Sequence, residues 1–269
     1  MAEANLYLTL LFKKKLNNKA LLYKKLIEWY INNGVENFVH VLNSNLLKAS
    51  EEIKNTSSDI YNKSLSIKKE IEIPSNDLDD VRTIEELKKS IILNCECLLK
   101  KTAKNMVFSD GNPKSNIMFI GEAPGEHEDK TGQPFKGEAG KLLDKMLNAI
   151  KLNRDNTYLT NIIFWRPPGN RKPTEEEINA CLPFVKKHID LINPKILVLV
   201  GATAASAILN IQSGITQIRG RWKSIETKNI KRLKSIAIFH PAFLLRQPTR
   251  KREAWEDLKK IKIEIDTYT

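Results

Sequence analysis

The chain has 269 residues, 41% of them hydrophobic, with a formal net charge of +12 and a pI near 9.4. No apolar run reaches the roughly 18 residues that a membrane span requires, and three cysteines are too few for a disulfide framework. We therefore expect a cytoplasmic protein with no membrane association. The positive charge favours a polyanionic partner, nucleic acid before membrane, although a generally lysine-rich proteome would give the same composition.

Three segments follow one another along the chain. Residues 1–49 are predicted to form a helical N-terminal extension, and residues 50–82, which are mostly polar and charged, to form a flexible linker. The main domain is expected over residues 83–269, beginning with a helix over 83–101. The apolar positions that carry the helical pattern of the extension are Leu21, Leu22, Leu26 and Ile27.

Strands and helices alternate after residue 115. Four short apolar runs have the length of buried strands: 116–120, 158–164, 196–200 and 235–239. Helices are predicted over 137–151, after a Thr174–Glu177 capping box, after Gly201 and after Pro248. This order is typical of an α/β fold, a three-layer α/β/α sandwich with a central four-stranded parallel sheet and right-handed crossovers.

A polar residue follows or ends most of these strands. Glu122 follows the first strand, Asn161 lies in the second, and His240 follows the fourth. Because ligands bind at the carboxyl ends of strands in an open parallel sheet, we expect the three side chains to converge. The turn at 121–125 lacks the G-x-G-x-x-G spacing, so a dinucleotide cofactor is not expected.

Each candidate has a functional and a structural interpretation. Phe135, which follows Pro134 in a glycine-bordered loop, offers a flat face for a base, or fills space under the loop. Asn161 has the paired donor and acceptor that match a pyrimidine edge, or else ties two loops together. His240 is either a catalytic group or a structural one.

The segment after His240 has features of a DNA contact. Leu244 and Leu245, next to Arg246, resemble an apolar wedge that enters a base stack while a cation holds phosphate. Alternatively, both leucines begin a buried helix. Two arginine loops, 166–171 and 219–222, are suited to phosphate binding.

Five segments together resemble the uracil-DNA glycosylase superfamily, in particular its family 4 and 5 group. They occur in the family's order over roughly 105–260: GEAPGEHEDKTGQPFKGEAG (121–140), YLTNIIFWRPPGNRKPT (158–174), ACLPF (180–184), RGRW (219–222) and HPAFLLRQP (240–248). The GEAPG start favours family 4. The resemblance implies an enzyme of base excision repair, a monofunctional hydrolase that flips uracil out of DNA and cleaves its N-glycosidic bond.

The resemblance also implies roles for single residues. Phe135 would stack on the flipped uracil, and Asn161 would hydrogen-bond its polar edge. Glu128 would occupy the space near C5 and so oppose the methyl group of thymine. His240 would donate to the carbonyl oxygen on which negative charge builds, and Glu122 would act on the water side of the site.

The implied DNA contacts lie in the loops around this site. The apolar wedge would be formed by Leu244 and Leu245. The cations placed against phosphates would be Arg166, Arg171, Arg221 and Arg246.

Family 4 proteins usually hold a 4Fe–4S cluster on four cysteines, and this chain departs from that pattern. Cys97 and Cys181 match the second and fourth ligands, so they are the residual candidates for a metal site. Asn94 stands in the first place, with Cys95 displaced by one residue, and Trp165 stands in the third. Since four thiolates are the normal requirement, we expect no cofactor and expect Trp165 to fill the volume.

Residues 1–80 have no counterpart in the resemblance, and they would contact a replication or repair protein or cap the domain. A monomer acting on uracil-containing DNA is expected. Two other functions stay open: a catalytically silent DNA-binding relative of the same fold, and a hydrolase of small nucleosides.

Overall fold

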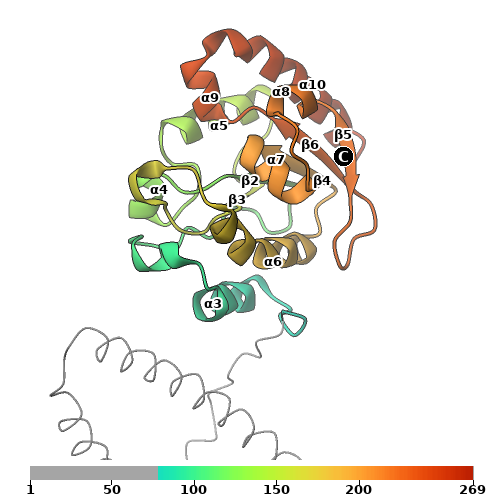
Figure 1. Cartoon of the computed structure of the whole chain (residues 1–269). Helices are drawn as coiled ribbons and strands as arrows, with labels where there is room; N and C mark the ends of the chain where they lie inside the picture. Colours follow the sequence, from blue (N-terminus) through green and yellow to red (C-terminus); the bar gives the residue numbers. More distant parts are fainter. Residues whose placement is uncertain (1–77, 269) are drawn as a thin grey trace, which may run out of the picture. The chain divides into compact units, whose positions relative to one another are not determined.

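A computed structural model describes residues 78–268 of the chain (Figure 1). The predictions for residues 1–49, and for all but the end of the predicted linker, lie outside the described residues. Within that end, Val81 is buried in the core and Leu78 packs against it. The described domain therefore takes in residues that the sequence assigned to the linker.

A six-stranded mixed sheet forms the centre of the domain, with the strand order β1-β3-β2-β4-β6-β5. Its strands are β1 (Asp110–Gly111), β2 (Ile117–Gly121), β3 (Tyr158–Asn161), β4 (Ile196–Val200), β5 (Trp222–Ile225) and β6 (Leu233–Ile238). The four central strands are parallel, as predicted, whereas β1 and β5 pair antiparallel at the two edges. Every residue of β2, β3 and β4 is buried, as expected for strands covered on both faces.

Helices cover both faces of the sheet, which confirms the predicted α/β fold. The main helices are α3 (Ile84–Asn94), α4 (Glu126–Thr131), α5 (Glu138–Ala149), α6 (Glu175–Ile192), α7 (Ala202–Leu209), α8 (Ile215–Ile218), α9 (Pro241–Arg246) and α10 (Lys251–Ile265). Figure 1 shows α3 and α6 on one side of the sheet and α5 and α10 on the other. Each side has its own apolar core, so the sheet is the middle layer of three.

Local sequence signals explain where α6 begins and ends. Thr174 accepts a hydrogen bond from the backbone of Glu177, whose side chain bonds back to Thr174, so the predicted capping box is confirmed. The helix ends at Asn193, which has a φ of 49°, immediately before Pro194. This long helix carries Cys181 and His188 into the core.

Two predictions of secondary structure were wrong. The helix expected over 83–101 stops at Asn94, and a short 3-10 turn (Leu98–Lys101) follows an extended Cys95–Cys97 segment. The edge strands β1 and β5 were missed, because β1 has two residues and β5 has exposed polar residues in its centre. Among residues 78–268, no helix combines the length and the apolar character needed to cross a bilayer.

Candidate active site

Asn161 and Phe135 meet at the end of strand β2. A Cβ added to Gly121 would lie 2.4 Å from Asn161 Oδ1 and 2.5 Å from Phe135 Cζ. Only glycine leaves room for both groups, which explains the glycine at this position. Asn161 pairs directly with Gly121 across the parallel strands. We call Gly121, Glu122, Phe135, Asn161 and His240 the strand-end cluster.

His240 completes the cluster from the end of β6. Its imidazole and the Phe135 ring are stacked, with centroids 6.2 Å apart and an interplanar angle of 28°. Gly201, at the end of β4, lies directly behind the imidazole. The structure therefore brings together the amide from the end of β3, the aromatic ring from the loop before α5 and the imidazole that follows β6. The chemical role of each stays a prediction.

The amide of Asn161 is open to a ligand. The residue is only 2% exposed, yet its amide forms no hydrogen bond with the other described residues. The amide atoms are not among the fully buried unpaired atoms of the described residues, so they border the open side of the cluster, where a ligand can reach them. The alternative in which Asn161 ties two loops together is therefore not supported.

The hydrogen bonding of His240 fixes where its proton lies. The backbone N–H of Ala242 donates to Nδ1 over 3.1 Å, so the proton of the neutral ring is on Nε2. Burial lowers the pKa of His240, which favours the neutral form; the charge of Arg246 acts in the same direction, whereas Glu122 and Glu128 oppose it. The cluster thus presents a neutral imidazole N–H donor in a fixed orientation.

Glu122 is held at the edge of the cluster by helix α7. Thr203 donates from Oγ1 to Glu122 Oε2 over 2.5 Å. The side chain is partly exposed, so its other oxygen has access to solvent. A carboxylate in this position can orient a water molecule or stabilise positive charge near the imidazole.

Glu128 is bound to backbone amides on both carboxylate oxygens. Oε1 accepts hydrogen bonds from the N–H groups of Lys136 and Gly137, each 2.7 Å long, and Oε2 accepts one of 3.0 Å from Gly125. This arrangement ties the start of α4 to the loop that carries Phe135. Its position against a bound base stays a prediction, and its observed contacts are those of a loop anchor.

The predicted DNA-binding arginines differ in their contacts. Arg171 forms a bidentate ion pair with Glu177, at 2.6 and 2.9 Å. Arg166 is bound to Asn170 over 2.7 Å. In contrast, Arg221 and Arg246 are exposed and form no hydrogen bond or ion pair with the other described residues. The last two are therefore the arginines most available to a phosphate.

The two leucines of the predicted wedge do not share one environment. Leu245 is 44% exposed on α9, as a wedge requires. Leu244 is 1% exposed and packs in the core with Phe239 and Leu258, so its assignment to the wedge was wrong. The reason is geometric, because successive side chains on a helix point about 100° apart and only one of the two can face outward.

The three cysteines form a second group, which we call the thiol cluster. Cys95, Cys97 and Cys181 are buried in one apolar core, and the Sγ atoms of Cys95 and Cys181 are 3.8 Å apart. Hydrogen bonds to the two neighbouring sulfurs, together with burial, raise the pKa of Cys181. The hydrogen bond with Cys181 lowers the pKa of Cys97 to about 7.

The donor set does not fit a four-thiolate iron–sulfur cluster. Trp165 stands in the place of a ligand, is 4% exposed, and packs edge-on against Phe164 in the same core as the thiols. The Asn94 side chain donates to Ser90. Among residues 78–268, no group of His, Cys, Asp or Glu has the arrangement of a metal site.

Sequence reasoning missed two residues that support the strand-end cluster. Thr203 lies in an alanine-rich helix start, where a threonine carries no functional signal. Arg154 lies in a polar turn, yet its guanidinium binds the backbone carbonyls of Pro134 and Phe135. Neither residue could have been found from local pattern, since both act across the fold.

Comparison with known proteins agrees with this geometry. The family model for the uracil DNA glycosylase superfamily matches residues 108–259. A type-4 uracil-DNA glycosylase of Sulfurisphaera tokodaii is 42% identical over 188 residues, covering 67% of this chain and 84% of that protein. One of Archaeoglobus fulgidus is 39% identical over 185 residues, covering 67% and 92%.

A type-5 uracil-DNA glycosylase of Pyrobaculum aerophilum is less similar. It is 27% identical over 147 residues, which cover 49% of this chain and 63% of that protein. The matched residues of the family model contain the whole strand-end cluster. The chain therefore belongs to the uracil-DNA glycosylase superfamily, and within it to the type-4 group.

Proposed function

We propose that this protein excises uracil from DNA by hydrolysing the N-glycosidic bond, which leaves an abasic site. The observation that carries the proposal is the convergence of Phe135, Asn161 and His240, with an Asn161 amide that has no partner among the described residues. An aromatic face, a paired donor and acceptor, and an N–H donor are the groups that an extruded pyrimidine requires. The names of the type-4 relatives support the same activity.

Each group has a defined part in the reaction. The Phe135 ring stacks on the uracil, and the Asn161 amide pairs with its carbonyl and N–H edge. As the glycosidic bond breaks, the bonding electrons move to the base and negative charge builds on its carbonyl oxygen. The Nε2–H of His240 donates to that oxygen, and a fixed donor of this kind lowers a barrier by about 3–4 kcal/mol.

Glu122 acts on the sugar side of the bond. As the base departs, the sugar gains oxocarbenium character, and a carboxylate nearby stabilises that positive charge. The hydrogen bond from Thr203 fixes one oxygen and leaves the other to orient the attacking water. The base leaves as an anion held by His240, so proton transfer from a general acid is not required.

DNA is held by the surface around the strand-end cluster. Leu245 enters the base stack in the space that the flipped nucleotide leaves, and Arg221 and Arg246 bind phosphates. Arg166 and Arg171 either bind phosphates after releasing part of their hydrogen bonds to Asn170 and Glu177, or they stiffen the 166–171 loop. We further propose that the protein acts as a monomer, and that residues 1–80 contact a replication or repair protein.

We propose that excision proceeds without a resident metal or cluster. This follows from the proposed chemistry, in which every charge is met by His240, Glu122 or Asn161. A visible absorption spectrum of anaerobically purified protein tests it. A featureless spectrum above 350 nm with full excision activity supports the proposal, and a broad iron–sulfur band that disappears together with activity contradicts it.

One experiment separates the proposed function from its two alternatives. The protein is incubated with a uracil-containing oligonucleotide and then with alkali, which cleaves abasic sites. Strand scission at uracil supports uracil excision, whereas binding without scission indicates a silent DNA-binding relative. Hydrolysis of free deoxyuridine without scission indicates a nucleoside hydrolase. A thymine oligonucleotide of the same sequence is the control for selectivity.

A further inference from the structure

The backbone of Phe135 adopts an uncommon conformation. Its φ is 56°, in the left-handed region, which a bulky side chain rarely enters. Such a conformation persists only where the surroundings hold it in place. Because the same residue supplies the aromatic ring of the strand-end cluster, the contacts that hold its backbone also set the position of the ring.

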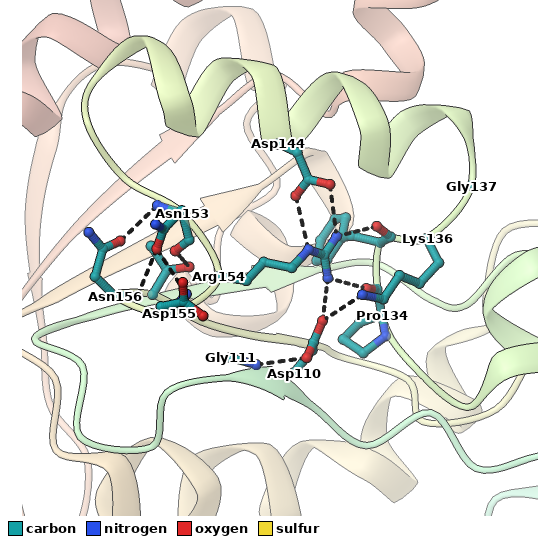
Figure 2. A network of polar contacts seen from close by, with 12 residues as sticks. Asp110, Gly111, Pro134, Lys136, Gly137, Asp144, Asn153, Arg154, Asp155 and Asn156 are labelled. Carbon is teal, nitrogen blue, oxygen red and sulfur yellow. Dashed lines mark hydrogen bonds and ion pairs between the residues drawn. The ribbon is translucent and has the colours of Figure 1, made fainter.

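Arg154 holds the two carbonyl groups on either side of this conformation. Its Nη2 donates to the carbonyl oxygen of Phe135 over 2.5 Å, and its Nη1 donates to that of Pro134 over 3.1 Å. Figure 2 shows the guanidinium reaching from the turn before β3 to the Phe135 loop. One side chain therefore binds consecutive peptide groups of the loop.

Two carboxylates fix the guanidinium itself. Nη1 also donates to Asp110 Oδ2 over 2.5 Å, and Nε donates to Asp144 Oδ1 over 3.0 Å (Figure 2). Lys136 joins Asp110 from the loop, at 3.0 Å. Burial would raise the pKa of Asp110, but the hydrogen bonds from Lys136 and Arg154 outweigh it and lower that pKa. The network therefore contains an ionised anchor below the loop.

The first turn of α5 closes the opposite side of the same carbonyl. A Cβ added to Gly140 would lie 1.8 Å from Phe135 O, so the helix backbone packs directly against it. The peptide after Phe135 is thus held between this helix and Arg154. With the backbone fixed in this way, the ring projects to Gly121 and stacks beside His240.

We propose that Arg154 is a positioning residue for base binding, one that holds Phe135 in the conformation that presents its ring to the flipped uracil. The inference rests on the proposed uracil excision. Lysine cannot replace arginine here, because the site needs a planar fork that bonds two carbonyls and two carboxylates at once. A purely structural ion pair would not require this geometry.

A structural experiment tests the proposal without any substrate. In a crystal structure of the Arg154→Lys variant, we expect residue 135 to leave the left-handed region or its ring to withdraw from Gly121. An unchanged φ together with an unchanged ring position would overturn the proposal. If Arg154→Lys does not fold, the Asp144→Asn variant weakens the hold on Nε and is expected to shift the ring in the same direction.

A double-mutant cycle tests the same idea through activity. We expect Arg154→Lys to lower kcat/KM for a uracil oligonucleotide about 10- to 100-fold, the range for a lost stacking contact or a small misplacement. In a Phe135→Ala background the same change should have almost no further effect. Independent losses that multiply would show that Arg154 acts elsewhere and would overturn the proposal.

The control and the failure modes are distinct. The control variant is Lys234→Met, which removes the ion pair between Lys234 and Glu264. Lys234 lies at the amino end of β6, away from the strand-end cluster, so we expect kcat/KM to stay unchanged. If the wild-type protein does not excise uracil, the proposed function fails, and the crystal structure still decides whether Arg154 holds Phe135.

Discussion

The strand-end cluster and the thiol cluster are both assembled from residues far apart in the sequence, but their polar atoms have different partners. In the strand-end cluster, the Asn161 amide has no partner among the described residues, and the Nδ1 bond of His240 leaves Nε2–H as a donor. In the thiol cluster, Cys95 bonds to the Ala180 carbonyl and contacts Cys181. The strand-end cluster leaves polar atoms available to a ligand, whereas the sulfur atoms of the thiol cluster contact one another and the backbone.

This contrast separates a group of side chains that is open to a ligand from a group whose atoms pair within the core. Polar atoms that border an open site without a protein partner are available to a ligand. Thiols that bond to each other beside a tryptophan are part of the core instead. Substitutions in the strand-end cluster should therefore change the reaction rate, and substitutions in the thiol cluster should change stability.

The largest expected effect is on stability, at Trp165. We expect Trp165→Ala to lower the free energy of unfolding by about 3–5 kcal/mol, because the buried ring leaves a cavity beside the thiols. Excision by the folded fraction should be unchanged. Urea unfolding measured beside single-turnover excision checks both. A loss of rate at full folding would instead connect the thiol cluster to the reaction.

The strand-end cluster should show the reverse behaviour at His240. We expect His240→Ala to lower kcat about 100- to 1,000-fold, because an oxyanion donor is lost. Loss of the α9 cap adds a stability cost of about 1 kcal/mol. Single-turnover excision and binding to a uracil-free oligonucleotide are measured together, with the exposed His127→Ala as control. If affinity fell together with the rate, His240 would be structural.

Much of the fold could be predicted because its signals are local. Continuous apolar runs indicated the central strands, and the Thr174–Glu177 capping box indicated the start of α6. The edge strands and the break at Cys95–Cys97 could not be predicted in this way. They depend on pairing with β3 and β6 and on packing of the cysteines against α6, which are tertiary effects.

Topology predicts a site residue only where that residue lies at a strand end. Asn161 and His240 follow from topology, since parallel strands bring their carboxyl ends together. Arg154 and Thr203 could not be found, because they reach the cluster across the fold. Leu244 and Leu245 show the limit most clearly. Both leucines matched the pattern of an apolar wedge, but the helix buries Leu244 in the core and leaves Leu245 exposed.

A second histidine extends the comparison to pH. His188 lies on the thiol side of the sheet, fully buried, stacked on Phe108 and bonded to Tyr158 over 2.8 Å. Burial lowers its pKa to about 3. The unfolded chain gains a proton below pH 6.5 and the folded chain does not, so stability is complete above pH 6.5 and falls toward pH 3.

We expect protonation of His188 in the unfolded chain to reduce the free energy of unfolding. The reduction is about 1.4 kcal/mol per pH unit below 6.5, or about 2 kcal/mol at pH 5. His240, whose pKa is also lowered, contributes in the same direction. The difference between the wild type and His188→Gln, in urea titrations at pH 7 and pH 5, isolates His188. Equal pH dependence in both proteins would show that His188 is not held neutral.

The smallest expected effect is that of Leu245→Ala, and its neighbour Leu244 on α9 provides the contrast. We expect Leu245→Ala to lower kcat/KM on duplex DNA about ten-fold, since an apolar wedge contributes a few kcal/mol at most to base extrusion, and to leave the melting temperature unchanged. Leu244→Ala should do the opposite and destabilise the domain by about 2–5 kcal/mol, because Leu244 is in the core. Thermal melting and excision are measured on both variants. Because the two residues are neighbours of one type, a matching loss of rate in both would assign the effect to α9 as a whole, not to the exposed wedge.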